Sequence, residues 1–351
     1  MKSNVKTAVM TGALEAKVIE RTLPKLKGHD VLVKVAACNI CTSEYGVFNG
    51  SRTNRPFPLV YGHEWAGYVE AVGEEVVSVE VGDYVASGYD YNPYSIPSRD
   101  GRTGECPYVS GANKDNGDGT FGNPGCAEYT VISEVALYKM DKGVDPSAAA
   151  FLEPVGTVCN GLRHMDMAFG ESLLIIGAGT MGILNALVAR AYGLNVFVSE
   201  MMENKINTAR ALGLTVINPK ETDIEAYIKE KTQGQGVDGV VIAVGATPAY
   251  DQAIKLVKNK RGKLLLFAAG YPSPELNIDA NNIHYRRMKV IGCYGADYMD
   301  FKMAASLINR KAINLEPLID EKFGLEDIQK AMEASIVPGK YRVSVLCNHL
   351  Q

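Results

Sequence analysis

The spacing of apolar and polar positions divides the chain into a β-rich part, an alternating middle and a short tail. Short apolar runs separated by turns over residues 5–36 and 57–86 predict strands. Between residues 172 and 285, apolar runs alternate with helical segments, which predicts an α/β fold with a Rossmann-type, doubly wound parallel sheet. The predicted strands and helices of this middle part are 195–198, 204–212, 223–232, 239–244, 248–259 and 263–267.

The segment 87–125 and the tail depart from both patterns. Residues 87–125 are rich in Gly, Asn, Asp, Tyr and Pro without periodicity, so we expect a long surface lobe there. The tail, with a predicted strand at 342–346, is short for a domain of its own and is expected to return to the first domain. The predicted organisation is therefore a β domain formed by 1–150 and completed by 286–351, and an α/β domain over 151–285.

A glycine turn at the centre of the chain carries the first chemical signal. Residues 172–200 give strand, turn, helix, strand and acid in the order of a dinucleotide-binding crossover. Gly177 permits the sharp turn, Gly179 lets backbone amides approach a pyrophosphate, and Gly182 lets the helix pack closely on the sheet. The alternatives are a turn that only joins two elements, and a membrane span over the uncharged stretch 172–189, against which its glycines and strand-like start argue.

Glu200 ends the second strand of this crossover. A carboxylate at this distance from the glycine turn accepts hydrogen bonds from the adenine-ribose diol and repels a 2′-phosphate. No arginine follows within residues 201–204. The sequence therefore predicts NAD rather than NADP.

Composition bounds the class of protein without naming its activity. The chain has 351 residues, of which 46% are hydrophobic and 22% charged, and its net charge is −4. These values indicate a globular chain of roughly two domains with no strong electrostatic attraction to nucleic acid or membrane. The polar N-terminus lacks a signal-peptide core, and the seven cysteines are scattered, as in a reducing compartment. We therefore expect a cytoplasmic protein that acts on a small molecule.

Cys41, His63 and Glu64 carry the second chemical signal. They follow predicted strands, so separate loops of one small β domain can bring them together. Thiolate, imidazole and carboxylate together suit Zn²⁺. Two plainer interpretations stay open: Cys38 and Cys41 as a redox pair or a structural zinc pair, and His63 as a loop histidine that is satisfied locally.

Taken in order, these pieces resemble the zinc-dependent medium-chain dehydrogenase/reductase family, the group of alcohol and sorbitol dehydrogenases. The resemblance covers nearly the whole chain and implies a GroES-like catalytic domain, a Rossmann domain, and a nicotinamide held beside zinc in the cleft between them. The segments that carry it are 35–44, 62–69, 72–73, 82–85, 126–129, 152–154, the glycine turn, 317–319 and 325–327.

The resemblance also implies roles for individual residues. Cys41 and His63 would be zinc ligands, and Glu64 would be a ligand in some states or a close second carboxylate. Glu153 matches a position that binds zinc directly or through water, with an ordinary helix-start acid as the alternative. Ser43 matches the hydroxyl that accepts the substrate's proton, so Ser43, Glu64 and Glu153 would be the catalytic side chains.

Three positions depart from the family pattern. Gly46 stands five residues after Cys41, where relatives often have a histidine, so the proton relay beyond Ser43 needs another route. The 87–125 lobe contains Cys106 alone, where many relatives bind a structural zinc with four cysteines; one catalytic and no structural zinc are therefore predicted. Asn39 replaces the usual glycine and is expected to form a left-handed turn.

The resemblance places two groups of residues against NAD. Lys205 would lie on the adenine side with Glu200, and it could also reach a 2′-phosphate. Residues 267–269 and 293–294 would lie near the nicotinamide, and simple packing at strand ends is the alternative for both. The residues expected to bind the cofactor are Gly177, Gly179, Thr180, Met181, Gly182, Glu200, Lys205, Phe267, Ala268, Ala269, Cys293 and Tyr294.

The substrate is less well defined. Glu153 in place of a cysteine, together with residues 283–287, looks like the polyol and sugar-alcohol branch. The leading hypothesis is a zinc- and NAD-dependent polyol or secondary-alcohol dehydrogenase that forms homodimers or homotetramers. The alternatives are a threonine-type amino-alcohol dehydrogenase and a zinc-free nucleotide-binding or quinone reductase-like protein. Arginines that could meet an anionic substrate, though such side chains more often form solvated surface, are Arg52, Arg55, Arg99 and Arg102.

Overall fold

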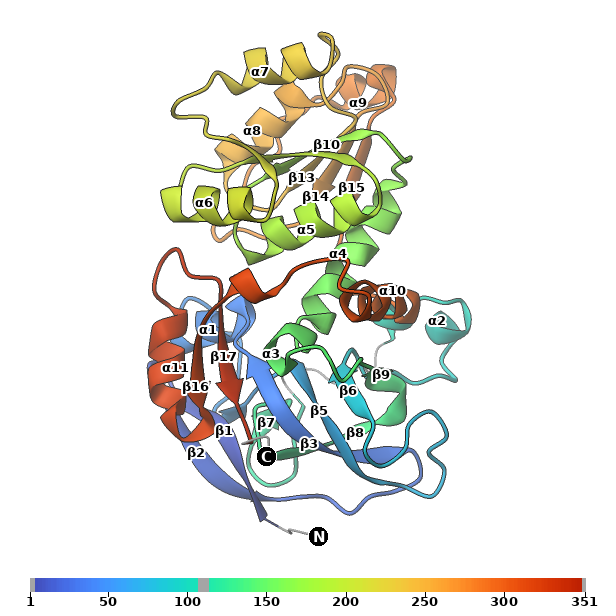
Figure 1. Cartoon of the computed structure of the whole chain (residues 1–351), viewed down its shortest axis with the longest axis vertical. Helices are drawn as coiled ribbons and strands as arrows, with labels where there is room; N and C mark the ends of the chain where they lie inside the picture. The colour runs from blue at the N-terminus through green and yellow to red at the C-terminus, as the bar shows by residue number, and fades with distance from the viewer. Residues whose placement is uncertain (1–3, 107–113, 349–351) are drawn as a thin grey trace. The chain divides into compact units, whose positions relative to one another are not determined.

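The computed structural model describes residues 4–106 and 114–348, which form two compact units (Figure 1). The first unit comprises Met1–Gly156, Ala296–Lys311 and Leu315–Gln351. The second comprises Thr157–Gly295 and Ala312–Asn314. The fold is α/β, and each unit has its own sheets and its own core.

The second unit contains a parallel sheet in the order β12-β11-β10-β13-β14-β15. This order runs outward from β10 in both directions, as in a dinucleotide-binding fold. The central strands are buried on both faces, which explains their continuous apolar sequences. The six strands are β10 (Ser172–Ile176), β11 (Asn195–Ser199), β12 (Thr215–Ile217), β13 (Gly239–Ile242), β14 (Lys263–Leu266) and β15 (Lys289–Gly292).

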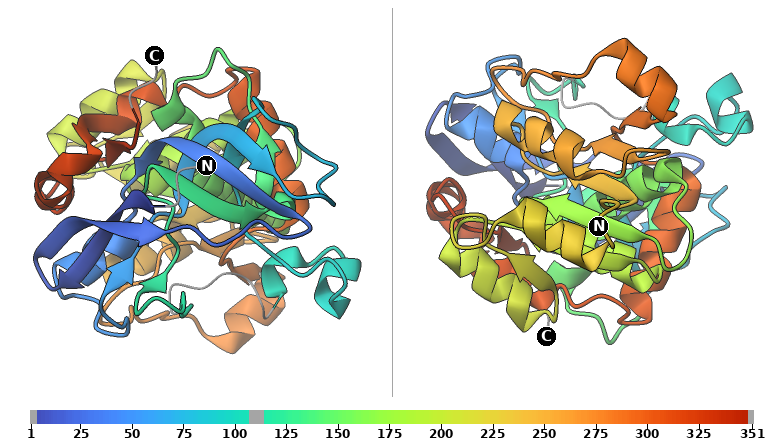
Figure 2. Two further views of the ribbon diagram at one scale, coloured as in Figure 1. Left: turned by 90° about the horizontal axis from the view of Figure 1, so that it is seen from below. Right: turned by 90° about the horizontal axis from the view of Figure 1, so that it is seen from above.

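Helices cover both faces of this parallel sheet. Figure 1 shows α5 and α6 on one face and α7, α8 and α9 on the other, and Figure 2 agrees in separating α6 from α8 and α9. The helices are α5 (Thr180–Ala191), α6 (Glu203–Ala211), α7 (Ile224–Lys231), α8 (Thr247–Leu256) and α9 (Ala280–Arg286). The predicted doubly wound sheet is confirmed.

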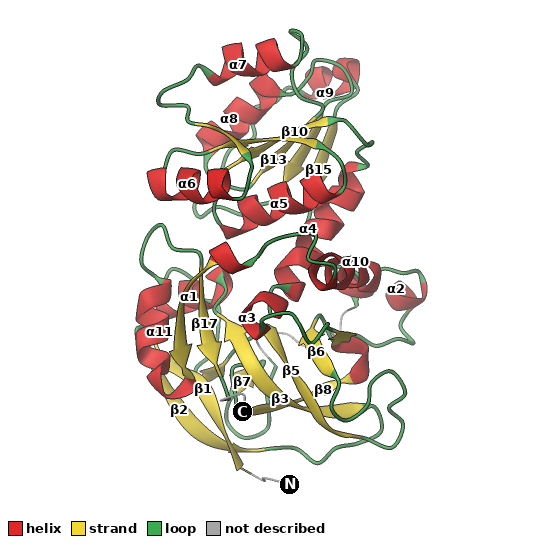
Figure 3. Ribbon diagram, viewed as in Figure 1, coloured by secondary structure: helices red, strands yellow, loops and turns green. Residues whose placement is uncertain are grey.

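The first unit is built from two sheets with a common apolar core. A four-stranded sheet has the order β2-β1-β4-β7, and a seven-stranded sheet has the order β16-β17-β3-β5-β6-β9, with β8 also paired to β3 (Figure 3). The strands are β1 (Asn4–Gly12), β2 (Glu15–Thr22), β3 (Asp30–Asn39), β4 (Leu59–Val60), β5 (Glu64–Val72), β6 (Tyr84–Ser87), β7 (Phe121–Gly122), β8 (Tyr129–Ser133), β9 (Leu137–Lys139), β16 (Ile319–Gly324) and β17 (Arg342–Leu346).

Short helices complete the first unit. Helix α11 packs against β2, β16 and β17. Helix α4 begins in this unit and continues into the second. The helices are α1 (Thr42–Phe48), α2 (Ile96–Arg99), α3 (Pro146–Ala149), α4 (Leu152–Met165), α10 (Tyr298–Asn309) and α11 (Ile328–Ser335). Among the described residues, no helix is both long and apolar enough to cross a membrane.

Strand β3 organises the first unit. It is antiparallel to β5, with Asn39 opposite Glu64, and antiparallel to the tail strand β17, with Ser344 opposite Asn39. The expected left-handed turn at Asn39 is wrong, because Asn39 ends β3 in extended conformation and its amide donates to the Ser147 carbonyl at 2.9 Å. Asparagine serves here as a buried hydrogen-bonding residue.

The segment 87–125 contains α2, β7 and a 3₁₀ turn at Thr103–Glu105. Its residues 107–113 lie outside the described part of the chain. Cys106 is buried in this segment and accepts hydrogen bonds from the Asn92 amide and the Ser95 hydroxyl. This cysteine therefore has a local structural role.

Candidate active site

Cys41, His63 and Glu64 come together in the first unit. Each offers one ligand atom, and these atoms lie within 4.8 Å of one another. The sheet explains the meeting, because β3 ends two residues before Cys41 and its last residue pairs with Glu64 at the start of β5. His63 immediately precedes that strand, so both ligand-bearing segments emerge at the same edge.

Glu44 links the two ligand-bearing segments. Its carboxylate accepts hydrogen bonds from the Cys41 amide at 2.9 Å, the Gly62 amide at 2.8 Å and His63 Nδ1 at 3.1 Å. Burial opposes the ionisation of Glu44, but the His63 charge and these bonds hold the pKa of Glu44 below its ordinary value. Glu44 thereby fixes the His63 ring and leaves Nε2 to face a ligand.

The electrostatics of the cluster favour positive charge. Burial opposes the protonation of His63, but the negative charges of Glu44 and Cys41 outweigh it and raise the pKa of His63 well above its ordinary value. The same negative charge suits a divalent cation. A thiolate, an imidazole and a carboxylate at this spacing fit Zn²⁺ better than Mg²⁺ or Ca²⁺, which prefer all-oxygen ligands.

Arg342 forms a buried ion pair with Glu64. Its Nε and Nη2 donate to the two carboxylate oxygens at 2.8 and 2.6 Å, and the side chains of Arg342 and Glu64 are 3% and 0% exposed. Arg342 Nη2 also lies 3.7 Å from Cys41 Sγ. Burial opposes the charge of Arg342, but Glu64 and Cys41 raise the pKa of Arg342 above its ordinary value, so the guanidinium stays charged.

Glu153 lies near the cluster but outside the 4.8 Å group. It stands in the first turn of α4 and is buried, and Tyr89 Oη donates to its Oε1 at 2.5 Å. Burial raises the pKa of Glu153, and the Glu64 charge adds to this shift while His63 and Tyr89 oppose it. A carboxyl group in this position could bind a metal ion held by the cluster, either directly or through a water molecule.

The two cysteines of the Cys-x-x-Cys motif have different environments. Cys41 is partly exposed and belongs to the ligand cluster. Cys38 is 1% exposed within the apolar core. A hydrogen bond with Cys126 opposes the shift, but burial raises the pKa of Cys38 to about 12. Cys38 therefore packs in the apolar core, apart from the ligand cluster that contains Cys41.

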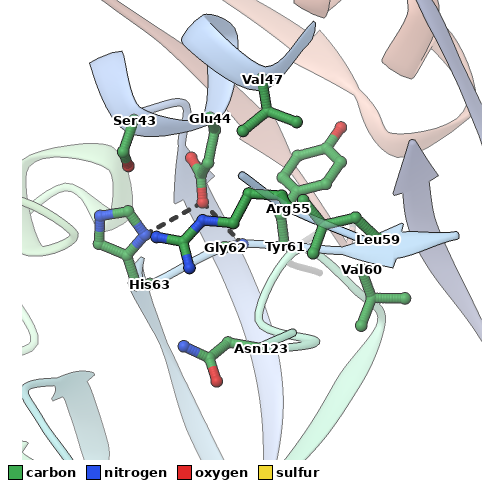
Figure 4. Close-up of a pocket in the computed structure, with 10 residues that line it drawn as sticks. All are labelled: Ser43, Glu44, Val47, Arg55, Leu59, Val60, Tyr61, Gly62, His63 and Asn123. Atoms are coloured by element: carbon green, nitrogen blue, oxygen red, sulfur yellow. Dashed lines mark hydrogen bonds and ion pairs between the residues drawn. The ribbon is translucent and has the colours of Figure 1, made fainter. Parts of the chain in front are cut away.

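A small pocket with an enclosed volume of about 40 Å³ adjoins His63. Ser43 lines it together with His63 (Figure 4). The residues of the lining are Ser43, Glu44, Val47, Arg55, Leu59, Val60, Tyr61, Gly62, His63 and Asn123.

The arginines that were candidates for binding an anionic substrate have different surroundings. Arg55 lines the pocket. Arg102 pairs with Asp100 and Glu105 on an exposed surface. Arg52 packs on α1, where a Cβ at Gly46 would lie 3.1 Å from its Cδ. The stem of Arg52 therefore fills the space in which a residue-46 side chain would begin.

The second unit gathers the expected cofactor residues at one edge of its sheet. Gly177 follows β10, Glu200 follows β11, Phe267 follows β14 and Cys293 follows β15. These are the carboxyl ends of parallel strands, where ligands of open α/β sheets bind. Ala268 and Ala269 continue from Phe267, while the Tyr294 side chain is fully exposed.

Glycine serves a different structural purpose at each position of the turn. Gly177 adopts φ +98°, which favours glycine. A Cβ at Gly182 would collide with the Gly177 carbonyl, so this glycine allows α5 to approach β10. A Cβ at Gly179 would meet only Lys205 Nζ, at 3.9 Å, which leaves its backbone accessible. Thr180 and Met181 open α5 beside the turn.

Glu200 is held over the glycine turn. Its Oε2 accepts a hydrogen bond from the Ala178 amide at 2.7 Å, and its Oε1 accepts from the Met201 and Met202 amides at 2.6 and 2.9 Å. This contact joins the end of β11 to the turn after β10. The Glu200 carboxylate therefore lies at the carboxyl ends of β10 and β11.

Four residues around the ligand cluster escaped the sequence analysis as site residues: Glu44, Tyr89, Asn123 and Arg342. Glu44 had a signal, because it stands three residues after a helix N-cap and completes a capping box with Cys41. Arg342 had a weaker one, since it is a charged residue at the start of an otherwise buried strand. Tyr89 and Asn123 had no local signal.

A segment of each unit matches a known protein family. The family described as "Alcohol dehydrogenase GroES-like domain" matches residues 27–142, and the family described as "Zinc-binding dehydrogenase" matches residues 180–310. The chain is 29% identical to L-threonine 3-dehydrogenase of Escherichia coli over 321 residues, which cover 89% of this chain and 90% of that protein.

Solved structures share the fold over the full length. Galactitol-1-phosphate dehydrogenase from Escherichia coli has a TM-score of 0.83 at 22% identity, covering 97% of this chain and 99% of its own. The 2R,3R-butanediol dehydrogenase from Bacillus subtilis has a TM-score of 0.81 at 24% identity, covering 98% and 100%. With both family matches in order along the sequence, the chain belongs to the zinc-dependent medium-chain dehydrogenase family, and it is an oxidoreductase.

Proposed function

We propose that the protein transfers a hydride between a secondary alcohol and NAD(H) at one zinc ion, with a polyol or sugar alcohol as the leading substrate class. The convergence of Cys41, His63 and Glu64 within 4.8 Å carries this proposal. These donors lie beside a pocket that Ser43 also lines. A zinc-free nucleotide-binding or quinone reductase-like protein would have no use for this donor set.

Cys41 and His63 would hold the zinc. Glu64 already binds Arg342 through both oxygens, so it would remain a neighbouring carboxylate while that ion pair holds. Glu153 would complete the ligand set directly or through water. Zinc bound by these residues would supply a Lewis acid for the alcohol oxygen, and bound NAD would supply the hydride acceptor.

The chain's own side chains would position the substrate and move its proton. Ser43 would accept the proton of the substrate hydroxyl at Oγ and pass it on, because a serine hydroxyl cannot retain it. Glu44 would keep the His63 ring oriented through Nδ1. Glu200 supports the choice of NAD, because its carboxylate would repel a 2′-phosphate.

A second candidate substrate is an amino-alcohol of the threonine type. The similarity to L-threonine 3-dehydrogenase over 89% of the chain supports this class. Threonine and polyols both present a secondary hydroxyl, so the same donors would serve either substrate. NADH formation with polyols, sugar acids, sugar phosphates and amino-alcohols would separate the two classes.

The ligand assignment has a direct test. Cys41→Ser and His63→Ala should each lower kcat by about 10³-fold or more, since a Lewis acid supplies several kcal/mol to such a reaction. NADH binding, followed by fluorescence titration, should persist in both variants. Cys106→Ser is the matched control, because that thiol lies outside the cluster. Near-normal turnover in either ligand variant would show that the assignment is wrong.

A further inference from the structure

Tyr89 donates a hydrogen bond to a carboxylate beside the ligand cluster. It lies shortly after β6, and its Oη is 2.5 Å from Glu153 Oε1. This distance is at the short end of the range for a hydroxyl that donates to a carboxylate, and such bonds are among the stronger hydrogen bonds in proteins. Glu153 is 7% exposed. The bond is therefore largely shielded from water and restrains the Glu153 side chain.

The position of Tyr89 is itself set by packing on Phe301. The two rings meet edge to face with their centroids 5.1 Å apart, and Phe301 is buried in α10. Two glycines leave the space that the Phe301 ring fills. A Cβ at Gly88 would lie 3.0 Å from this ring, and a Cβ at Gly156 would collide with it. Gly88 directly precedes Tyr89, and Gly156 stands about one turn after Glu153 in α4 (Figure 1). Phe301 therefore packs against both segments that carry the hydrogen bond.

Glu153 lies beside the ligand cluster but is not part of it. The charges of His63 and Glu64 act on the pKa of Glu153, so the three groups are neighbours. Among the described residues, the ligand atoms within 4.8 Å of one another are nevertheless those of Cys41, His63 and Glu64. All these residues, with Tyr89, belong to the first unit. The fold of this unit thus brings Glu153 near the cluster and leaves it outside.

The site would be closed if every candidate ligand bound the metal. A catalytic zinc has three protein ligands and keeps its fourth position for water or substrate, whereas a structural zinc is closed by four. Cys41, His63 and the two glutamates together would fill all four positions. One of them must be held back for catalysis, and the structure holds back Glu153, which Tyr89 binds outside the 4.8 Å group.

We propose that Tyr89 is a positioning residue that keeps Glu153 off the metal, so that this glutamate acts through water and the fourth position stays open to the alcohol. This inference rests on the dehydrogenase function proposed above. Loss of the Tyr89 hydroxyl should let Glu153 bind directly. Zinc should then bind about 10- to 100-fold more tightly, which is the usual size of an effect on metal affinity from a residue that supports a ligand. A tyrosine with only a packing role would not tighten zinc binding when its hydroxyl is removed.

The test compares the wild type with Tyr89→Phe, Glu153→Gln, the double variant and Tyr91→Phe. Zinc affinity would be measured by competition with a chromophoric chelator. The Co²⁺-substituted proteins would be compared by visible absorption, which reports the number and geometry of the metal ligands. Tyr89→Phe removes the hydroxyl and keeps the ring that packs on Phe301. Tyr91→Phe is the matched control, because it makes the same change two residues away, where the ring packs on Tyr298.

The inference holds if Tyr89→Phe binds zinc more tightly and changes the Co²⁺ spectrum, while Glu153→Gln and Tyr91→Phe keep the wild-type spectrum. The double variant should lose both effects of Tyr89→Phe, since they depend on the Glu153 carboxylate. Three results would overturn it: unchanged zinc affinity in Tyr89→Phe, weaker zinc binding in that variant, or effects that persist in the double variant. Weaker binding would show that Tyr89 instead supports Glu153 as a direct ligand.

Failure of the dehydrogenase proposal gives a different result. In that case the zinc-loaded wild type would form no NADH from 2,3-butanediol or L-threonine, and the zinc affinities and Co²⁺ spectra would still decide the role of Tyr89. If the wild type oxidises either alcohol, kcat should fall about 10-fold or more in Tyr89→Phe and stay unchanged in Tyr91→Phe. Unchanged turnover in Tyr89→Phe would overturn the claim that Tyr89 keeps a position open.

Discussion

The glycine turn of one unit and the ligand cluster of the other are assembled from very different lengths of chain. In the turn, the Ala178 amide reaches Glu200 across 22 positions. In the cluster, Arg342 reaches Cys41 across 301 positions and Glu64 across 278. A local turn depends on backbone conformations that glycines encode, whereas the cluster depends on the register in which distant strands pair.

This difference also separates the consequences of mutation. The ligand cluster brings several charges into a buried space, so the loss of one partner leaves another charge without compensation. The turn contains few charges, and its glycines act through steric access. We therefore expect mutations in the cluster to change stability most, and mutations in the turn to divide between packing and cofactor binding.

The largest expected effect is that of Arg342→Met. The variant leaves Glu64 buried without its guanidinium and should lower the free energy of unfolding by about 3–5 kcal/mol. Urea denaturation would measure it, and adding Glu64→Gln should recover part of the loss. Lys330→Met is the control, because its ion pair with Asp327 is 71% and 49% exposed and should contribute little. A small loss in Arg342→Met would mean that this pair is not structurally important.

The next prediction is that Gly182 matters for stability and Gly179 for cofactor binding. Gly182→Ala forces a Cβ against the Gly177 carbonyl and should destabilise the protein by about 1–3 kcal/mol. Gly179→Ala has room in the protein and should leave the unfolding midpoint nearly unchanged. It should instead weaken NADH binding by about 10-fold, because its methyl group approaches the pyrophosphate. Equal behaviour of the two variants in denaturation and titration would contradict the distinction.

Glu134 shows that long-range carboxylates stabilise the first unit outside the ligand cluster as well. It accepts hydrogen bonds from the Val77 and Ser78 amides and from His29, at 2.7 to 2.9 Å. Burial opposes ionisation, but the contacts with Ser78, Val77 and His29 lower the pKa of Glu134 to about 2.

The sign of the pH effect follows from this lowered pKa. The contribution of Glu134 is fully present above its ordinary pKa and is lost as the pH falls towards 2. Glu134→Gln should therefore cost about 1–2 kcal/mol at neutral pH, and the difference from wild type should shrink below pH ~4. Denaturation curves at several pH values would measure it. A difference that is constant with pH would exclude a charge effect.

The smallest expected effect concerns the choice of cofactor. Glu200→Ala should narrow the ratio of kcat/KM for NAD over NADP by about 10-fold, because it removes the repulsion of a 2′-phosphate. Glu203→Ala, in the first turn of α6, is the control for a general loss of charge. An unchanged ratio in Glu200→Ala would contradict the proposed role of Glu200. Lys205 would then be the next residue to test for its effect on the choice between NAD and NADP.

Much of the fold could be predicted because its signals are local. The alternation of apolar runs and helices in the middle of the chain predicted the parallel sheet, and the glycine pattern predicted the tight turn at Gly177 between β10 and α5. The meeting of Cys41, His63 and Glu64 could be proposed from the sequence because the residue types themselves carry the chemistry of a metal site. The structure brings these three together, and their roles at a metal ion, like the roles of Ser43 and Glu153, remain proposals.

The residues that support the cluster could not be found in the same way. Arg342 lies beyond the last residue of β3 only because β17 pairs with β3 in this register, and it can then contact Glu64 and Cys41. The pairing of Tyr89 with Glu153 likewise depends on how the segment after β6 packs on α4. The left-handed turn expected at Asn39 failed because a buried amide contact with Ser147 replaced the backbone role.

The zinc content of the purified protein tests the central claim most directly. We predict about one zinc per chain in the wild type, none retained by Cys41→Ser or His63→Ala, and no loss in Cys106→Ser. A value near two would instead indicate a structural zinc as well. Less than about 0.3 zinc per chain in carefully prepared wild type, with turnover indifferent to a chelator, would contradict a zinc-dependent reaction at this cluster.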